Sequence, residues 1–118
     1  MPEISFDPAK NERNIASRGI SFQVAEQFEW DTALVVEDLR QTYGERRFQA
    51  LGIIAGRLHA MVFTPRSGKV HVISLRKANR REVKRYEAEG QGDEQDEGQD
   101  DVARSQHRGI IGQLGIRN

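Results

Sequence analysis

Three apolar stretches separated by turn-forming residues constrain the fold of this chain more than any other feature. Residues 47–54, 58–64 and 69–75 are rich in the apolar and β-branched side chains that strands favour. The tight turn 55–57 separates the first two stretches, and the Pro- and Gly-containing turn 65–68 separates the second from the third. The middle stretch is apolar on both faces, as is typical of a central strand. The sequence therefore predicts an antiparallel meander.

Helix signals lie on both sides of this meander. Asp7 and Pro8 suit the cap and the first position of a helix over residues 8–17. A second, short helix is expected over residues 22–28, which present one apolar face. A capping-box pattern begins a basic helix over residues 79–88.

Two further stretches have the pattern of short strands, and the one nearer the meander would be its fourth strand. Residues 33–36 are apolar and β-branched, and residues 3–6 alternate in the manner of an edge strand. The fold class is therefore α+β. We expect N-terminal helices packed on a three- to four-stranded antiparallel sheet, followed by a C-terminal helix.

Composition divides the chain into a domain and a tail. Its 118 residues support one compact domain, which we place at residues 1–89. Residues 90–118 form an acidic, Gly-rich tail, which we expect to be disordered because its first dozen residues offer no apolar surface to offset ordering entropy. Residues 1–87 hold 15 basic and 11 acidic residues, so the body carries a net charge of +4. A basic body favours a polyanionic partner.

Several classes of protein are excluded or disfavoured. The chain has no cysteine, so disulfides and thiolate metal sites are excluded, and a reducing cytoplasm is the expected compartment. No apolar run approaches the roughly 20 residues of a membrane span, and no secretory signal opens the chain. The tail carboxylates lack the spacing of a calcium loop, so we predict no metal and no cofactor.

Basic residues stand at the ends of the predicted strands. Arg47 opens one strand and Arg66 follows the next, so both lie at one end of the sheet. Arg76 closes the last strand and lies at the other end. Basic residues spread diagonally in this way would contact an extended phosphate backbone rather than form a single pocket. His59 and His71 lie on strands, and we interpret both as ordinary surface or half-buried histidines.

The order of short motifs along the chain resembles the BrnT toxins, a family within the RelE-like group, over residues 4–87. In order these motifs are Phe6-Asp7-Pro8-Ala9-Lys10, Asn14, Gly19-Ile20-Ser21-Phe22, Glu45-Arg46-Arg47, Phe63-Thr64-Pro65-Arg66, Val72-Ile73-Ser74-Leu75-Arg76-Lys77-Ala78 and Glu82-x-x-x-Tyr86. The resemblance implies a RelE-like fold and metal-independent RNA cleavage that inhibits translation and growth. It also implies a ribbon-helix-helix antitoxin of the BrnA type, which forms a hetero-oligomer with the toxin and carries it to operator DNA.

Site residues follow from this resemblance. Arg66 and Arg76 match basic positions of the family and would stabilise the phosphorane. Lys10 or Glu45 would act as the base, and Tyr86 as an acid or a stacking ring. Further basic residues would bind RNA, namely Arg18, Arg47, Lys77, Arg80 and Arg81. Arg18 stands where the family usually has His, and a guanidinium cannot replace an imidazole as a base.

Two other interpretations of the function remain open. The basic sheet could belong to a non-catalytic module that binds RNA or docks an antitoxin. The chain could also be a degenerate toxin that acts as a co-repressor and reaches DNA only through its partner. Cleavage of naked RNA by the purified chain would distinguish a ribonuclease from both of these alternatives.

Overall fold

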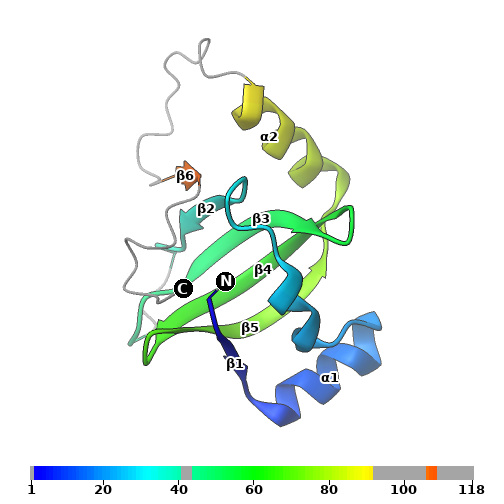
Figure 1. Cartoon of the computed structure of the whole chain (residues 1–118), viewed down its shortest axis with the longest axis vertical. Helices are drawn as coiled ribbons and strands as arrows, with labels where there is room; N and C mark the ends of the chain where they lie inside the picture. Colours follow the sequence, from blue (N-terminus) through cyan, green and yellow to red (C-terminus); the bar gives the residue numbers. More distant parts are fainter. Residues whose placement is uncertain (1, 41–43, 92–105, 109–118) are drawn as a thin grey trace.

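A mixed β-sheet runs through the protein in the computed structural model, which describes residues 2–40, 44–91 and 106–108 (Figure 1). The strands lie in the order β1-β5-β4-β3-β2-β6. They are β1 (Ile4–Phe6), β2 (Leu34–Glu37), β3 (Phe48–Ile54), β4 (Arg57–Arg66), β5 (Lys69–Lys77) and β6 (Gln106–Arg108). Antiparallel pairing joins β2 to β3, β3 to β4 and β4 to β5, so the predicted meander is confirmed.

Both hairpins of the meander close through two-residue turns. Ala55 and Gly56 have φ values of 50° and 79°, and Ser67 and Gly68 have values of 55° and 74°. Positive φ at both turn positions is the type I′ geometry, whose twist matches that of the adjoining strands. The second turn is shorter than predicted, because Pro65 and Arg66 still belong to β4.

The prediction of three to four antiparallel strands was wrong. Five strands come from residues 4–77, and β6 adds a sixth beside β2. The sheet is mixed because β1 pairs in parallel with β5, with Ile4 opposite Val70 and Phe6 opposite Val72. This pairing satisfies backbone groups that would otherwise be unpaired at the β5 edge. The rest of the predicted tail, apart from β6 and the end of the last helix, lies outside the described residues.

Helices flank the sheet at the points expected. Helix α1 (Pro8–Arg18) begins after Asp7, whose carboxylate accepts a hydrogen bond from the Ala9 amide at 2.9 Å, and ends at Gly19 with φ 72°. The predicted second helix is a 3₁₀ helix, η1 (Phe22–Gln27), and α2 (Arg80–Gln91) follows the meander. No helix in the described part of the chain is long and apolar enough to cross a membrane.

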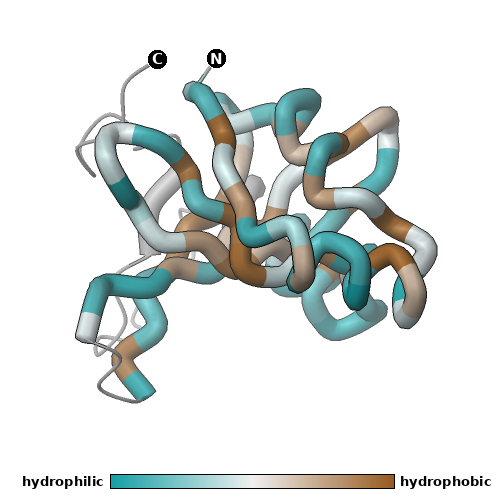
Figure 2. Tube along the Cα trace, turned by 90° about the horizontal axis from the view of Figure 1, so that it is seen from below, coloured by the Kyte–Doolittle hydropathy of each residue, from teal (hydrophilic) through white to brown (hydrophobic). Residues whose placement is uncertain are grey.

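The larger part of the core lies between the sheet and η1. Phe22 and Phe28 are almost fully buried there against Phe63 and Met61 of β4. Gly52 of β3 allows this packing, because a Cβ at that position would lie 2.7 Å from Cε2 of Phe28. Figure 2 shows hydrophobic residues along the segments that cross the middle of the protein.

Helix α2 covers only part of the opposite face. A smaller apolar cluster lies beneath it, formed by Leu34, Leu51, Leu58 and Ala60 with Val83 and Tyr86 of the helix packed against it. Side chains that alternate along a strand share a face, so the face that buries Leu51 under α2 also carries Gln49. That uncovered part of the sheet is where the candidate site lies.

Candidate active site

Charged side chains line a cleft of about 420 Å³ at the end of the sheet where β3 begins and β4 ends. Its polar lining comes from four different segments of the chain: Asp7, Lys10, Glu45, Arg47, Arg66 and His71. We call these six residues the Arg66 cluster. The sequence resemblance assigned Lys10, Glu45, Arg47 and Arg66 to RNA cleavage or binding, and the fold brings these four together.

Local structure explains how the segments meet. The parallel pairing of β1 with β5 places the first turn of α1, with Lys10, beside β5. In the β4–β5 hairpin His71 lies opposite Thr64, and Thr64 shares its face with Arg66 two residues on. His71 and Arg66 therefore project from the same side of the sheet.

The segment that carries Glu45 and Arg47 is tied to the sheet from both sides. Thr64 donates its hydroxyl to the carbonyl of Arg46 at 2.6 Å. The Arg46 guanidinium lies 5.1 Å from the centre of the Phe48 ring and donates two hydrogen bonds to Glu37, at 2.9 and 3.0 Å. These hydrogen bonds hold the pKa of the Glu37 carboxyl below its ordinary value. The loop before β3 therefore presents Glu45 and Arg47 from a fixed backbone.

Arg66 is the hub of the cluster. Its Nη2 donates to both carboxylate oxygens of Glu45, at 3.1 and 3.0 Å, and its Nη1 lies 3.1 Å from Nε2 of His71. The side chains of Arg66 and Glu45 are 49% and 34% exposed to solvent, so solvent or a ligand can reach the guanidinium. A planar guanidinium held this way is oriented to bind phosphate oxygens.

The contacts of His71 fix its protonation. An arginine can only donate, so Nε2 accepts from Arg66 and the ring proton of the neutral imidazole lies on Nδ1. That nitrogen donates to the Ser5 hydroxyl of β1 at 2.9 Å. Partial burial, and then the positive charge of Arg66 and of Lys10, lower the pKa of His71 below its ordinary value. The imidazole is therefore neutral near neutral pH, with an unprotonated nitrogen facing the cleft.

The other residues assigned from the sequence lie elsewhere. Arg76 forms a double hydrogen bond with Glu82 of α2, both at 2.8 Å, at the opposite end of β5 from Lys69. Tyr86 packs against the apolar cluster under α2. Lys77, Arg80 and Arg81 adjoin Arg76 at the end of β5 and the start of α2.

Arg18 is also separate from the cleft. It is exposed in the last turn of α1, on the order of 12 Å along the helix axis from Lys10. The structure thus places the position where the family usually has His away from the Arg66 cluster.

Two members of the cluster were not assigned to a site from the sequence. Asp7 was predicted only as a helix cap, and His71 was missed because a histidine on a strand is usually structural. The hairpin register contained the signal: a two-residue turn after Arg66 places residue 71 opposite residue 64, beside the arginine. His59, by contrast, is buried, and its Nδ1 lies 2.8 Å from the carbonyl of Arg57. In the described ranges no three His, Asp or Glu side chains gather as a metal site.

Fold and site together define a small α+β protein with a cleft lined by charged side chains at one end of its sheet. A family model described as the ribonuclease toxin, BrnT, of type II toxin–antitoxin systems matches residues 6–82, which include the whole Arg66 cluster. The chain belongs to this family and is a ribonuclease toxin with an antitoxin partner. No curated protein sequence matches the chain.

Proposed function

We propose that the Arg66 cluster cleaves RNA without a metal ion, by transfer of the phosphate to the neighbouring 2′-hydroxyl. The observation that carries this proposal is the arginine held between a carboxylate and a neutral imidazole. Such a site offers a cation for the developing charge and a base that needs no activation. Arg76 and Tyr86 are left out, because neither lines the cleft.

The chemistry assigns one role to each residue. Nε2 of His71 removes the proton of the 2′-hydroxyl, whose oxygen forms a bond to phosphorus while the bond from phosphorus to the 5′-oxygen breaks. Lys10 donates a proton to the departing 5′-oxygen. The products are a 2′,3′-cyclic phosphate and a 5′-hydroxyl, and solvent restores both side chains.

Arg66 and Arg47 stabilise the phosphorane between these two proton transfers. Before the RNA binds, Arg66 is occupied by His71 and Glu45. A phosphate that binds at Nη1 replaces the contact with His71, and Nε2 of His71 then becomes available as the base. Glu45 keeps hold of Nη2 and so orients the guanidinium throughout, which makes it a positioning residue in this scheme.

The partner we propose is a ribbon-helix-helix antitoxin of the BrnA type, which forms a hetero-oligomer with the toxin and alone contacts operator DNA. The sequence resemblance supports this type of antitoxin, and the same resemblance supports a RelE-like fold and the arrest of translation and growth. Co-expression of the chain with the protein of the adjacent reading frame tests the partner, with recovery of a stable complex as the expected result.

The catalytic proposal is tested with the purified chain and a short RNA in the presence of a chelator such as EDTA. We expect cleavage that persists in the chelator and yields a cyclic phosphate end. The variants His71→Gln and Arg66→Ala should retain the fold and lose most of the rate. Loss of all cleavage in the chelator would contradict metal independence. Absence of cleavage under every condition would favour the non-catalytic alternatives.

A further inference from the structure

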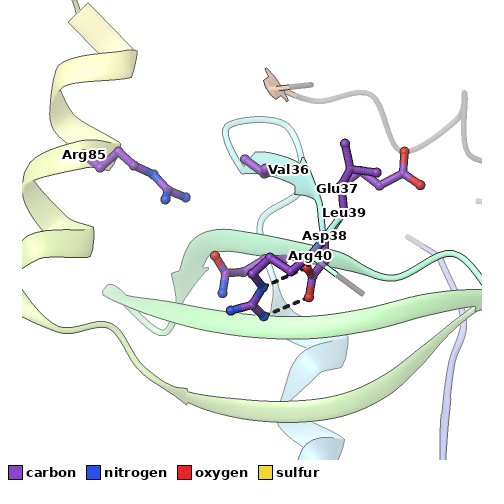
Figure 3. Close-up of a pocket in the computed structure, with 7 residues that line it drawn as sticks. Val36, Glu37, Asp38, Leu39, Arg40 and Arg85 are labelled. Carbon is purple, nitrogen blue, oxygen red and sulfur yellow. Dashed lines mark hydrogen bonds and ion pairs between the residues drawn. The ribbon is translucent and has the colours of Figure 1, made fainter. Parts of the chain in front are cut away.

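A second cavity, of about 470 Å³, lies between β2, β3 and α2 (Figure 3). Its lining residues are Val36, Glu37, Asp38, Leu39, Arg40, Gln49 and Arg85. We propose that this cavity, the Gln49 pocket, binds one nucleobase of the RNA next to the cleaved phosphate and so sets the base preference of the enzyme. This inference rests on the proposed function, because it assigns the substrate contacts of the same cleft.

The pocket lies next to the cleft of the Arg66 cluster along β3. Along β3 and the residue before it, Ile53, Leu51, Gln49 and Arg47 follow at alternate positions and share a face. The first two pack with α2, Gln49 lines the pocket, and Arg47 lines the cleft of the Arg66 cluster. The Cα atoms of Gln49 and Arg47 are about 7 Å apart, as alternate residues of a strand are. A single nucleotide can bridge that separation, with its phosphate in the cleft and its base in the pocket.

The backbone joins the two sites directly. The amide of Asp38 donates to the carbonyl of Arg47 at 2.8 Å, which continues the pairing of β2 with β3 beyond Glu37. The Asp38 side chain is 10% exposed, and Arg40 donates to it from Nε and Nη2, both at 2.9 Å. Figure 3 shows this pair at the edge of the pocket. The wall of the pocket is therefore fixed relative to the phosphate-binding end of the sheet.

The pocket combines apolar and polar groups in the way that a base requires. Val36 is buried directly opposite Gln49, and the Leu39 side chain is a large apolar group with 64% exposure. Apolar side chains such as these can cover the face of an aromatic ring. The side-chain amide of Gln49 has no hydrogen-bond partner in the described part of the chain. An amide offers a donor and an acceptor side by side, which matches the edge of a nucleobase.

Arg85 limits the pocket on the side of α2. Figure 3 shows its side chain extending from the helix towards the sheet. A guanidinium plane is a surface on which bases stack, and its positive charge also favours an anionic occupant such as nucleic acid over a basic or neutral one. An exposed leucine by itself would fit a protein partner equally well. The unpartnered amide and the shared backbone with the phosphate site favour a base.

The test separates base reading from cleavage. The full chain is mixed with short RNAs that differ only in the base beside one cleavage site, and the four rates are compared. Gln49→Glu keeps the size of the side chain and removes the donor, so we expect the ratio between the best and worst base to change by about tenfold. The matched control is Gln27→Glu, an exposed glutamine on η1, and it should leave the ratio unchanged.

A binding measurement keeps the inference independent of catalysis. The full chain, labelled with ¹⁵N, is titrated with each of the four nucleoside monophosphates, and amide shifts are followed at residues 36–40 and 49. We expect shifts at these positions, weakened in Leu39→Ala, whose exposed side chain is replaced without disturbing the core. If nucleotides shift these amides but no RNA is cleaved, the pocket stands and the proposed function fails. Cleavage with unaltered base ratios in folded Gln49→Glu, or shifts caused by the antitoxin and by no nucleotide, would overturn the inference.

Discussion

Nη1 of Arg66 lies 3.1 Å from Nε2 of His71, so a permanent cation faces the ring nitrogen that would accept the proton of the RNA hydroxyl. A neighbouring positive charge opposes protonation of an imidazole. The arginine thus favours a neutral imidazole, and in the proposed mechanism the phosphate replaces His71 at Nη1 while Glu45 retains Nη2. In the proposed mechanism the same contact places the base next to the cation that stabilises the phosphorane.

The pKa of His71 provides the first prediction. We expect the NMR titration of His71 to have a midpoint below the ordinary histidine value of about 6.5. Arg66→Gln removes a cation, so it should raise that midpoint, whereas Arg57→Gln at the far end of β4 should not. The acid limb of the cleavage rate should follow the same pKa. Equal midpoints in wild type and Arg66→Gln would contradict the proposed contact.

The lowered pKa of His71 also affects stability. Because the folded pKa lies below the unfolded one, the unfolded chain binds the proton more tightly in the range between them. The contribution of His71 is therefore fully present above the unfolded pKa, and it is lost as the pH falls through the window below about 6.5. Thermal unfolding of wild type and His71→Gln should show a smaller pH dependence in the variant over this window.

Arg66→Ala tests the phosphate contact. Loss of one preorganised donor to a developing charge typically costs about 3 kcal/mol, so we expect cleavage to fall roughly a hundredfold. The side chain is half exposed, and the variant should therefore remain folded. Arg57→Ala, also exposed on β4, is the matched control for loss of a positive charge. A folded Arg66→Ala protein with undiminished cleavage and toxicity would remove Arg66 from the site.

The Arg76–Glu82 pair should matter for stability and not for chemistry. Glu82 accepts both hydrogen bonds of Arg76, accepts from the Asn79 amide at 2.9 Å, and has a pKa lowered chiefly by Arg76. Glu82→Gln weakens this anchor of α2, and we expect a loss of roughly 1–2 kcal/mol in the free energy of unfolding. Well below the melting temperature its cleavage rate should equal that of wild type. A large loss of rate in the folded variant would return Arg76 to the catalytic set.

Gly52 should not tolerate a side chain. An added Cβ would lie 2.7 and 2.8 Å from two ring atoms of Phe28, so the ring must move within a packed core. We expect Gly52→Ala to destabilise the protein by about 1–3 kcal/mol in chemical denaturation. In a Phe28→Leu background the same change should cost less, because the obstructing ring is gone. Additive effects of the two substitutions would show that the contact does not matter.

Those parts of the fold that depend on near neighbours could be predicted from the sequence. The meander follows from three apolar stretches and two turn signals, and α1 follows from the Asp7 cap. The parallel pairing of β1 could not be predicted, because its three residues meet a partner more than 60 positions away. Short strands carry little register information of their own, and only the assembled β5 edge selects the pairing.

The candidate site could likewise be predicted only in part from the sequence. Family motifs pointed to Lys10, Glu45 and Arg66, which the fold does bring together. They also pointed to Arg76, whose guanidinium is instead engaged by a carboxylate on α2. His71 was missed because the properties that distinguish it come from Ser5 and Arg66, and neither neighbour is visible from its position on a strand.

The Ser5–His71 hydrogen bond has a consequence for when the toxin becomes active. It joins residues 66 positions apart, across the one parallel pairing in the described sheet. Contacts distant in sequence form after local hairpins, because a long loop must first be closed. On a ribosome, β1 must wait until β5 has been synthesised before it can pair. The orientation of His71 is therefore completed only when the body of the domain has been made, and with His71 as the proposed base a partly synthesised toxin would not cleave the RNA around it.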